Sequence, residues 1–394
     1  MKITNYEKVL KKINEPIAFV LGSYLTTGLG VVRSLARQNI PVVWLDSNTR
    51  QLGFFSKYCY GILCHNLKKD EEKYIDFLLN IGEKLNHKGI LFSTGDIETL
   101  AILKKRALLE KYFLIPMSNL ATSEIFLNKR LFYKSLKKQG ISHPLTYFPV
   151  DTNEVKSISR QINYPCIVKP SYSGYFRSEF HKKFFIAKSS NELVSFYENA
   201  ISRNHDVIIQ ELIAGNATDM YGFNAYYNKN FEHTGAIMYR RIREWPHCFG
   251  NGCFIENVDV PEIEKTINSF VKKIGYNGII DAEFRKDPKD GKFKLIEVNA
   301  RCWMQVSLST RCSVNIPYMA YLDACGKKVE KLKSSKENVK WIFMYYDFIS
   351  ALKSILKGKL SVYTWIKSLS GKKEYAVYAK DDLLPFILLY LNTL

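Results

Sequence analysis

The sequence of 394 residues predicts an α/β and α+β protein with a parallel-sheet domain, a second unit with sheets of its own and a helical C-terminal unit. Three observations predict this organisation. In residues 1–117, short apolar segments alternate with amphipathic helical patterns, as in parallel sheets. In residues 118–326, strand patterns return, and two of them are joined by a tight turn. In residues 327–394, lysines and aromatic residues accumulate.

The N-terminal part is expected to form a Rossmann-like parallel sheet. Strands are predicted at residues 17–21, 41–46 and 88–93, and helices near residues 28–36 and after residues 94–96. A turn at Gly22 and Ser23 follows the first strand. Because open α/β sheets place ligands at their strand ends, Gly22 and Asp96 are candidate ligand-binding residues, although the role of helix N-cap is the favoured interpretation of Asp96.

The glycines of this first turn and helix superficially resemble a dinucleotide site. Gly22, Gly28 and Gly30 follow the order GxxxxxGxG, however, whereas the dinucleotide fingerprint is GxGxxG. We therefore interpret them as glycines that the turn requires. The sequence also contains no GxxxxGK[ST], so any ATP site is not a P-loop.

The second unit is expected to begin with a helix from an N-cap at Ser123 to Gln139, with Gly140 in the C′ position. Strand patterns follow at residues 164–169, 206–211, 278–285 and 292–298. Helical patterns separate them at about residues 190–203 and 261–275. Residues 171–178, rich in Ser and Tyr with one Gly, are expected to form an exposed loop.

The strongest local signal is a hairpin of two strands around the turn at residues 287–291. Side chains two residues apart on a strand share a face, so Glu297 and Asn299 face one side, as do Asp281 and Glu283. Two carboxylates and a carboxamide brought together by paired strands suit magnesium, and the nearby Arg301 suits a phosphate or carboxylate oxygen. The alternative is an ordinary solvated hairpin face, which would alternate in the same way.

Further features of the second unit fit a nucleotide site. Lys169 ends an apolar strand, where its ammonium group could reach a phosphate, and Lys129 lies on the helix that opens the unit. The apolar strand at residues 207–211 leads into a short linker, as expected beside an adenine.

Taken in order, these motifs resemble the ATP-grasp superfamily over about residues 118–325. They are Lys129, Tyr-Pro-x-Ile-Val-Lys-Pro, Gln-Glu-x-Ile-x-Gly and the hairpin with Glu-x-Asn-x-Arg. The resemblance implies a two-lobed ATP-grasp domain, with a smaller nucleotide lobe at about residues 145–212. The preceding sheet resembles the domain in front of the grasp in carbamoyl-phosphate-synthase-like and D-aspartate-ligase-like members.

The resemblance also implies roles for single residues. Lys129 and Lys169 match the phosphate-contacting lysines, and Lys183 is a third candidate that could equally be an ordinary surface lysine. The adenine-binding linker matches the consecutive residues Gln210, Glu211, Leu212 and Ile213.

The acidic hairpin residues match the metal and substrate positions of the family. Glu283, Glu297 and Asn299 match the ligands of magnesium, for which manganese is a substitute. Arg301 matches the arginine that contacts phosphate or substrate, and Arg243 resembles a substrate-side arginine of the ligase-like members. The loop after Lys169 departs from the family because it has one glycine, Gly174, beside Tyr172, Tyr175 and Phe176, which would make a bulkier lid.

The formal charge of +19 favours anionic partners such as nucleotides, carboxylates and lipid headgroups. No block of five lysines or arginines occurs, so nucleic acid is not expected as a partner. The eight cysteines are scattered without a CxxC pair, which favours reduced thiols over a zinc site. The sequence shows no signal peptide and no long apolar run, so a cytoplasmic location is expected.

The expected function is that of an ATP-dependent carboxylate–amine ligase, which forms an amide or peptide bond through an acyl phosphate and releases ADP and phosphate. The partners would be a small carboxylate and an amine, with an amino acid and a cell-envelope precursor as candidates from the D-aspartate-ligase-like resemblance. The alternatives are a non-catalytic ATP-binding module of the same fold and a basic nucleic-acid-binding protein.

The C-terminal part is expected to be a helical unit packed on the grasp domain. It carries thirteen lysines against six acidic residues, with aromatic residues between them. A peripheral contact with the inner face of an anionic membrane is the second interpretation of this composition.

Overall fold

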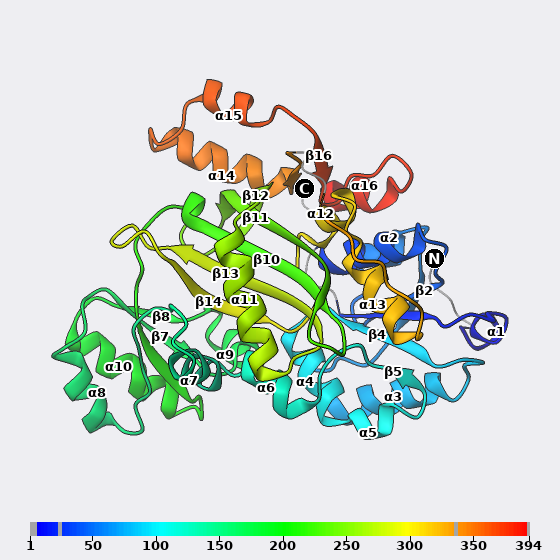
Figure 1. Ribbon diagram of the computed structural model, residues 1–394, viewed down its shortest axis with the longest axis horizontal. Coiled ribbons are helices and arrows are strands. Elements are labelled where there is room, and N and C mark those ends of the chain that lie inside the picture. The colour runs from blue at the N-terminus through cyan, green and yellow to red at the C-terminus, as the bar shows by residue number, and fades with distance from the viewer. Residues whose placement is uncertain (1–5, 23–25, 335–337, 392–394) are drawn as a thin grey trace.

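The computed structural model describes residues 6–22, 26–334 and 338–391, and these residues form three sheets. A five-stranded parallel sheet, a four-stranded antiparallel sheet and a seven-stranded sheet occupy different parts of the molecule (Figure 1). The predicted combination of a parallel sheet with a second unit that has sheets of its own is thereby confirmed. The predicted turn residue Ser23 lies outside the described residues.

The parallel sheet has the strand order β3-β2-β1-β4-β5. Its strands are β1 (Ala18–Leu21), β2 (Val42–Asp46), β3 (Tyr60–Leu63), β4 (Gly89–Ser93) and β5 (Phe113–Leu114). The connecting helices are α1 (Tyr6–Leu10), α2 (Thr27–Ala36), η1 (Leu52–Phe55), α3 (Glu71–Gly82), α4 (Asp96–Lys104) and α5 (Arg106–Leu109). The order reverses between β1 and β4, and such a switch point is where open α/β sheets bind ligands.

The N-terminal glycines serve turn and packing geometry. Gly22 has φ +73°, a left-handed conformation that favours glycine. A Cβ on Gly28 would lie 2.5 Å from the Trp44 ring, so glycine lets α2 approach β2 closely. This agrees with the interpretation that these glycines do not form a dinucleotide fingerprint.

Two helices, and not the single one expected, open the second unit. They are α6 (Leu120–Leu127) and α7 (Lys129–Lys138). Asn119 caps α6 and Asn128 caps α7, each through its side chain, whereas the expected cap Ser123 lies buried inside α6. The sequence pattern missed this break because α7 continues the helical pattern of α6 after one extended residue. Gly140, with φ +65°, ends α7 as predicted.

The four-stranded sheet forms the smaller lobe. Its order is β6 (Thr146–Tyr147), β9 (Val207–Glu211), β7 (Cys166–Pro170) and β8 (Phe185–Ala187). Helices α8 (Thr152–Ser159) and α10 (Ser190–Ile201) pack on it. The loop expected at residues 171–178 is wrong, because most of it belongs to α9 (Ser173–Phe180), whose Phe176 is buried in the core of this lobe.

The seven-stranded sheet is the centre of the molecule (Figure 1). Its order is β14 (Phe293–Asn299), β13 (Gly278–Lys286), β10 (Met220–Tyr227), β11 (His233–Trp245), β12 (Asn251–Val258), β15 (Lys340–Ile342) and β16 (Lys373–Tyr375). Helix α11 (Pro261–Ile274) covers one face, and η2 (Ala217–Asp219) precedes β10. The other face shares a core with α2, α12 (Val306–Arg311) and α13 (Ile316–Ala324), which fixes the central sheet against the parallel-sheet domain.

The C-terminal part contains the helices α14 (Met344–Leu356), α15 (Val362–Ser368) and α16 (Leu384–Leu391). The expected helical unit is present, and in addition β15 and β16 extend the central sheet. These strands have three residues each, too few for an alternating pattern to show in the sequence. No helix among the described residues has the length and apolar character to cross a bilayer.

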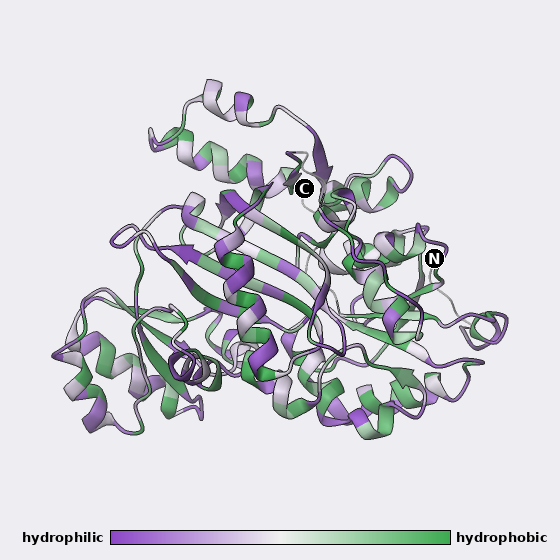
Figure 2. Ribbon diagram, viewed as in Figure 1, coloured by the Kyte–Doolittle hydropathy of each residue, from purple (hydrophilic) through white to green (hydrophobic). Residues whose placement is uncertain are grey.

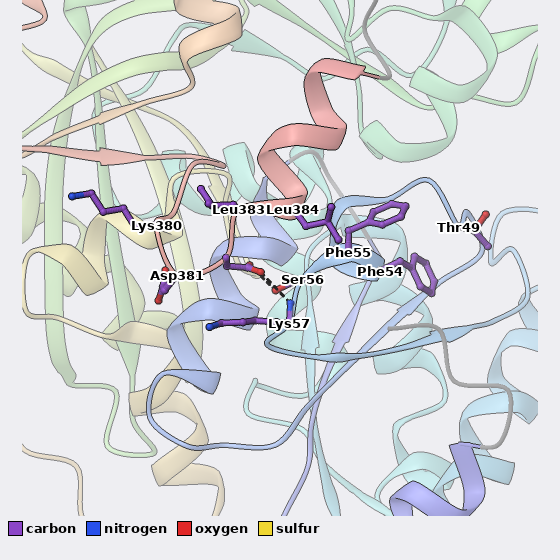
Figure 3. Close-up of a pocket in the computed structure, with 10 residues that line it drawn as sticks. Thr49, Phe54, Phe55, Ser56, Lys57, Lys380, Asp381, Leu383 and Leu384 are labelled. Atoms are coloured by element: carbon purple, nitrogen blue, oxygen red, sulfur yellow. Dashed lines mark hydrogen bonds between the residues drawn. The ribbon is translucent and has the colours of Figure 1, made fainter.

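A buried ion pair anchors the C-terminal segment to the N-terminal domain. Arg33 Nε donates to Asp382 Oδ2 at 3.0 Å, and Ser56 Oγ donates to the same oxygen at 2.7 Å. Figure 3 shows Ser56 beside Phe54, Phe55, Leu383 and Leu384, which line a cavity of about 770 Å³ with the two aspartates of this segment. The segment around Asp382 is thereby fixed on the parallel-sheet domain.

Candidate active site

The candidate site is a cleft of about 860 Å³ to which all three sheets contribute. The smaller lobe contributes Lys169 and Gln210, the central sheet contributes Glu283 and Glu297, and the parallel sheet contributes the segment 94–98. The cleft therefore lies at the β1/β4 switch point and opens between the lobes.

Two rows of polar side chains cross the hairpin β13–β14. Asp281 lies opposite Asn299, and Glu283 lies opposite Glu297. The prediction that these residues share one face is confirmed, and all four line the cleft. A register shift directly after Glu283 interrupts the pairing, which continues from Phe284 opposite Leu295.

Glu297 is the electrostatic centre of this cleft. Its Oε1 accepts a hydrogen bond from Lys129 Nζ in an ion pair whose side chains are largely buried. Burial alone would raise the pKa of the Glu297 carboxyl, but the charges of Lys129, Lys169 and Arg301 lower it well below its usual range. Glu297 is therefore a permanent anion in contact with cations.

Lys169 is held in place by Tyr133. Its ammonium lies 5.5 Å from the centre of the Tyr133 ring and 3.5 Å from the hydroxyl, which in turn donates to the Ile296 carbonyl at 2.5 Å. Burial lowers the pKa of Lys169, and the charges of Glu297 and Glu283 act against this shift. A buried ammonium group directed at an acidic hairpin is suited to an anion that enters between them.

Asp281 forms the base of the acidic row. Asn224 Nδ2 donates to one of its oxygens at 2.8 Å, and Asn299 Nδ2 donates to the other at 3.0 Å. Burial and the neighbouring charge of Glu283 raise the pKa of Asp281 to about 7. The bond from Asn299 fixes its amide group, so that its oxygen points away from Asp281.

Arg301 joins the hairpin to the parallel-sheet domain. Its Nε donates to Asp96 Oδ1 at 2.5 Å, and its Nη2 donates to Asn299 Oδ1 at 3.3 Å. Asp96 is the first residue of α4 and Gly95 is its N-cap, so the interpretation of Asp96 as the N-cap is wrong. Both predicted candidates, Arg301 and Asp96, lie in the cleft.

The structure does not bring Arg243 into the cleft. Its guanidinium donates to both carboxylate oxygens of Asp347, at 2.6 and 3.2 Å, and lies over the Phe254 ring. Arg241 lines the cleft instead and donates to Glu283 at 2.7 Å. Residues two apart usually share a face, but a register shift between Arg241 and Arg243 breaks that rule here, so sequence reasoning missed Arg241.

The predicted linker residues all line the cleft: Gln210, Glu211, Leu212 and Ile213. The Gln210 amide donates to Thr146 at 2.8 Å. The Glu211 carboxylate accepts from the Leu145 amide at 2.8 Å and from Lys294 at 3.3 Å, so it fixes the edge of the smaller lobe. Its assignment to adenine stays a prediction.

Lys183 also lines the cleft, where it bridges the lobes. Its ammonium donates to the Phe249 carbonyl at 3.0 Å and to the Asn251 side chain at 3.2 Å. These contacts join the segment before β8 to the β11–β12 connection. Its role as a phosphate contact stays a prediction.

Two of the three side chains expected to form a bulky lid have other contacts. Phe176 belongs to the core of the smaller lobe, and the Tyr172 hydroxyl donates to Glu124, while Tyr175 is exposed. Gly174 lines the cleft, and a Cβ there would lie 2.6 Å from the Ile97 side chain. Glycine therefore permits the close approach of α9 to α4.

Glu98 is a cleft residue that sequence reasoning missed. Its carboxyl lies against two glycines, since a Cβ on Gly22 or Gly95 would come within 2.8 or 2.2 Å of its oxygens. Burial, followed by the charge of Asp96, raises the pKa of Glu98. The position of Glu98 in the cleft depends on its contact with Gly22, which lies 76 positions earlier in the chain. No local sequence pattern predicts that contact.

Comparison with known proteins agrees with this architecture. No protein-family model matches the chain. D-aspartate ligase of Enterococcus faecium is 27% identical over 226 residues, which are 54% of this chain and 53% of that protein. Carbamoyl phosphate synthase large chain of Methanothrix thermoacetophila is 26% identical over 285 residues, 69% of this chain and 24% of that protein. The chain thus spans about half or less of the length of these curated relatives.

Two solved structures show the same arrangement over most of the chain. The biotin carboxylase domain of the Hydrogenobacter thermophilus 2-oxoglutarate carboxylase, solved with MgADP and bicarbonate, has a TM-score of 0.61 at 17% identity and covers 81% of this chain and 71% of its own. L-amino acid ligase from Bacillus licheniformis has a TM-score of 0.60 at 15% identity and covers 79% and 74%. The chain has the ATP-grasp fold.

The ATP-grasp resemblance found in the sequence is therefore confirmed at the level of the fold. Within this fold, the chain places its predicted lysines and acidic hairpin residues in one cleft and leaves Arg243 outside it. The roles of the single residues remain predictions.

The donor set of the ATP-grasp hairpin fits magnesium. Glu283 and Glu297 offer carboxylate oxygens and Asn299 an amide oxygen, the hard donors that this ion prefers. In the described residues, no three His, Cys, Asp or Glu side chains are arranged to hold a metal. The proposed donor set includes the amide of Asn299, and its two carboxylates are each paired with a cation, Glu283 with Arg241 and Glu297 with Lys129.

Proposed function

We propose that the protein is an ATP-dependent carboxylate–amine ligase that forms an amide bond through an acyl phosphate and releases ADP and phosphate. One observation carries the proposal: buried cations and an acidic hairpin converge in a single cleft at the switch point of the parallel sheet. The similarity to proteins named D-aspartate ligase and L-amino acid ligase supports it.

The polyphosphate of ATP would lie between Lys129 and Lys169. Both ammonium groups are buried and lie close to the carboxylate of Glu297. An incoming phosphate would therefore meet cations that are already fixed in place and already have an anion as partner. The residues 210–213 would border the adenine, because they line the same cleft beside β9.

Magnesium would be held by Glu283, Glu297 and Asn299, with manganese as a substitute. When bound, it would neutralise charge on the transferring phosphoryl group. The chain's own contribution is to fix these donors: the register of β13 and β14 sets the two carboxylates opposite each other, and Asp281 orients the Asn299 amide.

The carboxylate substrate would bind at Arg301 and Arg241. Its oxygen would attack the γ-phosphorus, ADP would leave, and the amine nitrogen would then attack the acyl carbon with loss of phosphate and one proton. Fixed guanidinium groups stabilise the negative charge that develops on the oxygens in both steps. Asp96 would keep Arg301 aimed at this place through its hydrogen bond.

The amine would enter at Glu98. This carboxyl lies at the ends of β1 and β4, and no lysine or arginine forms a salt bridge with it among the ion pairs of the described residues. It is suited to hold an ammonium group and to receive the proton that the amine loses. The resemblance to D-aspartate ligase favours an amino acid as one of the two substrates.

A screen of paired carboxylates and amines tests the proposal. ADP and phosphate release is measured in the presence of ATP and magnesium, and products are identified by mass spectrometry. A ligase releases one ADP for each amide formed, with both substrates required. If the protein binds an ATP analogue but forms no product with any amino-acid pair and no ADP, it is a non-catalytic ATP-binding module.

A further inference from the structure

The helices α14 and α15 form a hairpin that exposes large apolar side chains and buries polar ones. On α14, four large apolar side chains recur every four residues and all are exposed: Met344, Phe348, Leu352 and Leu356. The residues that α14 buries are Asp347, Ser350 and Ala351. A helix that packs on a domain by an apolar stripe shows the opposite distribution.

Helix α15 continues the exposed apolar surface. Val362, Tyr363 and Ile366 are 53, 73 and 60% exposed, and α15 has no buried residue. Together with the exposed stripe of α14 they define what we name the hairpin surface. Figure 1 shows both helices at the upper edge of the molecule, and Figure 2 shows apolar residues recurring along α14.

A buried polar cluster holds the hairpin in this orientation. Asp347 accepts from Arg243 and, at 3.1 Å, from the indole nitrogen of Trp365 on α15. Arg243 also donates to Ser368 at 3.0 Å. This polar cluster seats the two helices together with Tyr345 and Tyr346 of α14, which pack on the core of the central sheet, and the side chains of the hairpin surface stay exposed.

Lysines lie on the same two helices as the hairpin surface. Residues 348–373 contain six lysines and no acidic residue. Lys353, Lys357, Lys359 and Lys367 are exposed on or between the two helices. Exposed apolar side chains with exposed lysines on the same two helices match the boundary between the headgroups and acyl chains of an anionic bilayer.

We propose that the hairpin surface docks the protein on an anionic membrane, independently of the proposed ligase activity. Two other occupants fit less well. A second copy on a two-fold axis would set this lysine-rich patch against itself, which like charges oppose. A nucleic acid would leave Leu356 and Ile366 against charged phosphates. Since α14 has 13 residues, or about 20 Å, it would lie in the interface and not cross it.

The hairpin is joined to the cleft wall through Glu244 of β11. Ser350 of α14 donates to the Glu244 carbonyl at 2.9 Å, and Glu244 lines the cleft and contacts Arg241. The hairpin is thus seated on the end of the strand that forms one wall of the cleft.

Sedimentation of the full chain with vesicles tests the proposal. Vesicles of phosphatidylcholine with phosphatidylglycerol are compared with phosphatidylcholine alone, at low and high salt. We expect binding to the anionic vesicles at low salt and release at high salt. Leu356→Glu with Ile366→Glu should abolish binding, and Lys357→Gln with Lys359→Gln should weaken it at least about tenfold.

Matched variants on other surfaces serve as controls, with circular dichroism to confirm that each variant is folded. Val150→Glu replaces an exposed apolar residue of the smaller lobe, and Lys137→Gln with Lys138→Gln replaces two exposed lysines of α7. These should bind like the parent. The proposal is overturned if the parent stays in the supernatant, if the Leu356→Glu and Ile366→Glu variant still binds, or if the hairpin instead mediates a dimer that this variant dissociates.

Discussion

Arg301 Nε donates to Asp96 Oδ1 at 2.5 Å, across 205 positions of the chain. The bond joins Arg301, two residues after the end of β14, to the first residue of α4 in the parallel-sheet domain. Burial would lower the pKa of Arg301, but the charge of Asp96 raises it above its usual value. The guanidinium is therefore always charged and is held by both domains that form the cleft.

A double-mutant cycle on this pair should show strong coupling. Asp96→Asn, Arg301→Gln and the double variant are compared by urea unfolding. Because the pair is partly buried and hydrogen-bonded, we expect a coupling energy of about 1–3 kcal/mol. Additive effects of the two changes would show that the domains are held by other contacts, such as the core around α2.

Lys169→Ala and Lys129→Ala should each weaken the binding of a non-hydrolysable ATP analogue. Each removes a buried ammonium group, and hydrogen bonds to charged groups contribute about 1.5–3 kcal/mol, so we expect a loss of about tenfold or more in affinity. Calorimetry measures it, with Lys137→Ala on the exposed face of α7 as the control. Unchanged affinity in both variants would move the nucleotide out of this cleft.

Arg241→Gln should lower the activity of the protein, whereas Arg243→Gln should lower its stability. Arg241 contacts Glu283 in the cleft, so its loss should lower kcat/KM at least about a hundredfold. Arg243 pairs with buried Asp347, so its loss should cost about 3–5 kcal/mol of stability and leave kcat within about threefold. Urea unfolding and steady-state kinetics separate the two. If the two variants lost equal activity, Arg243 would have to act in the active site, and the prediction would be wrong.

Glu98→Gln should raise the KM for the amine, because a neutral amide holds an ammonium group less well. The pKa of Glu98 is raised, so the parent should lose amine affinity as the pH falls toward that pKa, at a higher pH than an ordinary glutamate would. The variant should lack this pH dependence. Glu110→Gln, on the exposed surface of the same domain, is the control. An unaltered KM and pH profile would exclude Glu98 from the amine site.

Much of the site follows from local sequence. The strict alternation of Glu297, Asn299 and Arg301 and the turn at residues 287–291 define a hairpin, and pairing alone then sets Glu283 opposite Glu297. The parallel sheet likewise follows from alternating apolar segments. In both cases the periodicity of one or two strands determines which side chains meet.

The remaining features depend on contacts that a local pattern does not contain. Because of the register shift in β11, Arg241 and not Arg243 lines the cleft. The extended backbone of Asn128 divides one expected helix into two. Glu98 enters the cleft only because two distant strands are neighbours. Strand β15 pairs with β12, and β16 pairs with β15. The three residues of each of these strands contain no pattern that predicts a strand.

The most direct test of the ligase proposal is ADP release by the parent and by Glu297→Gln, with the amide product measured in the same reactions. Glu297 is the anion shared by both lysines and by the proposed metal site, so its neutral variant should lose at least about a hundredfold in turnover while its circular dichroism is unchanged. Glu256→Gln, the same change on β12 where the carboxylate pairs with Arg240, should retain activity. Near-normal, product-coupled ADP release by a folded Glu297→Gln variant would contradict the account.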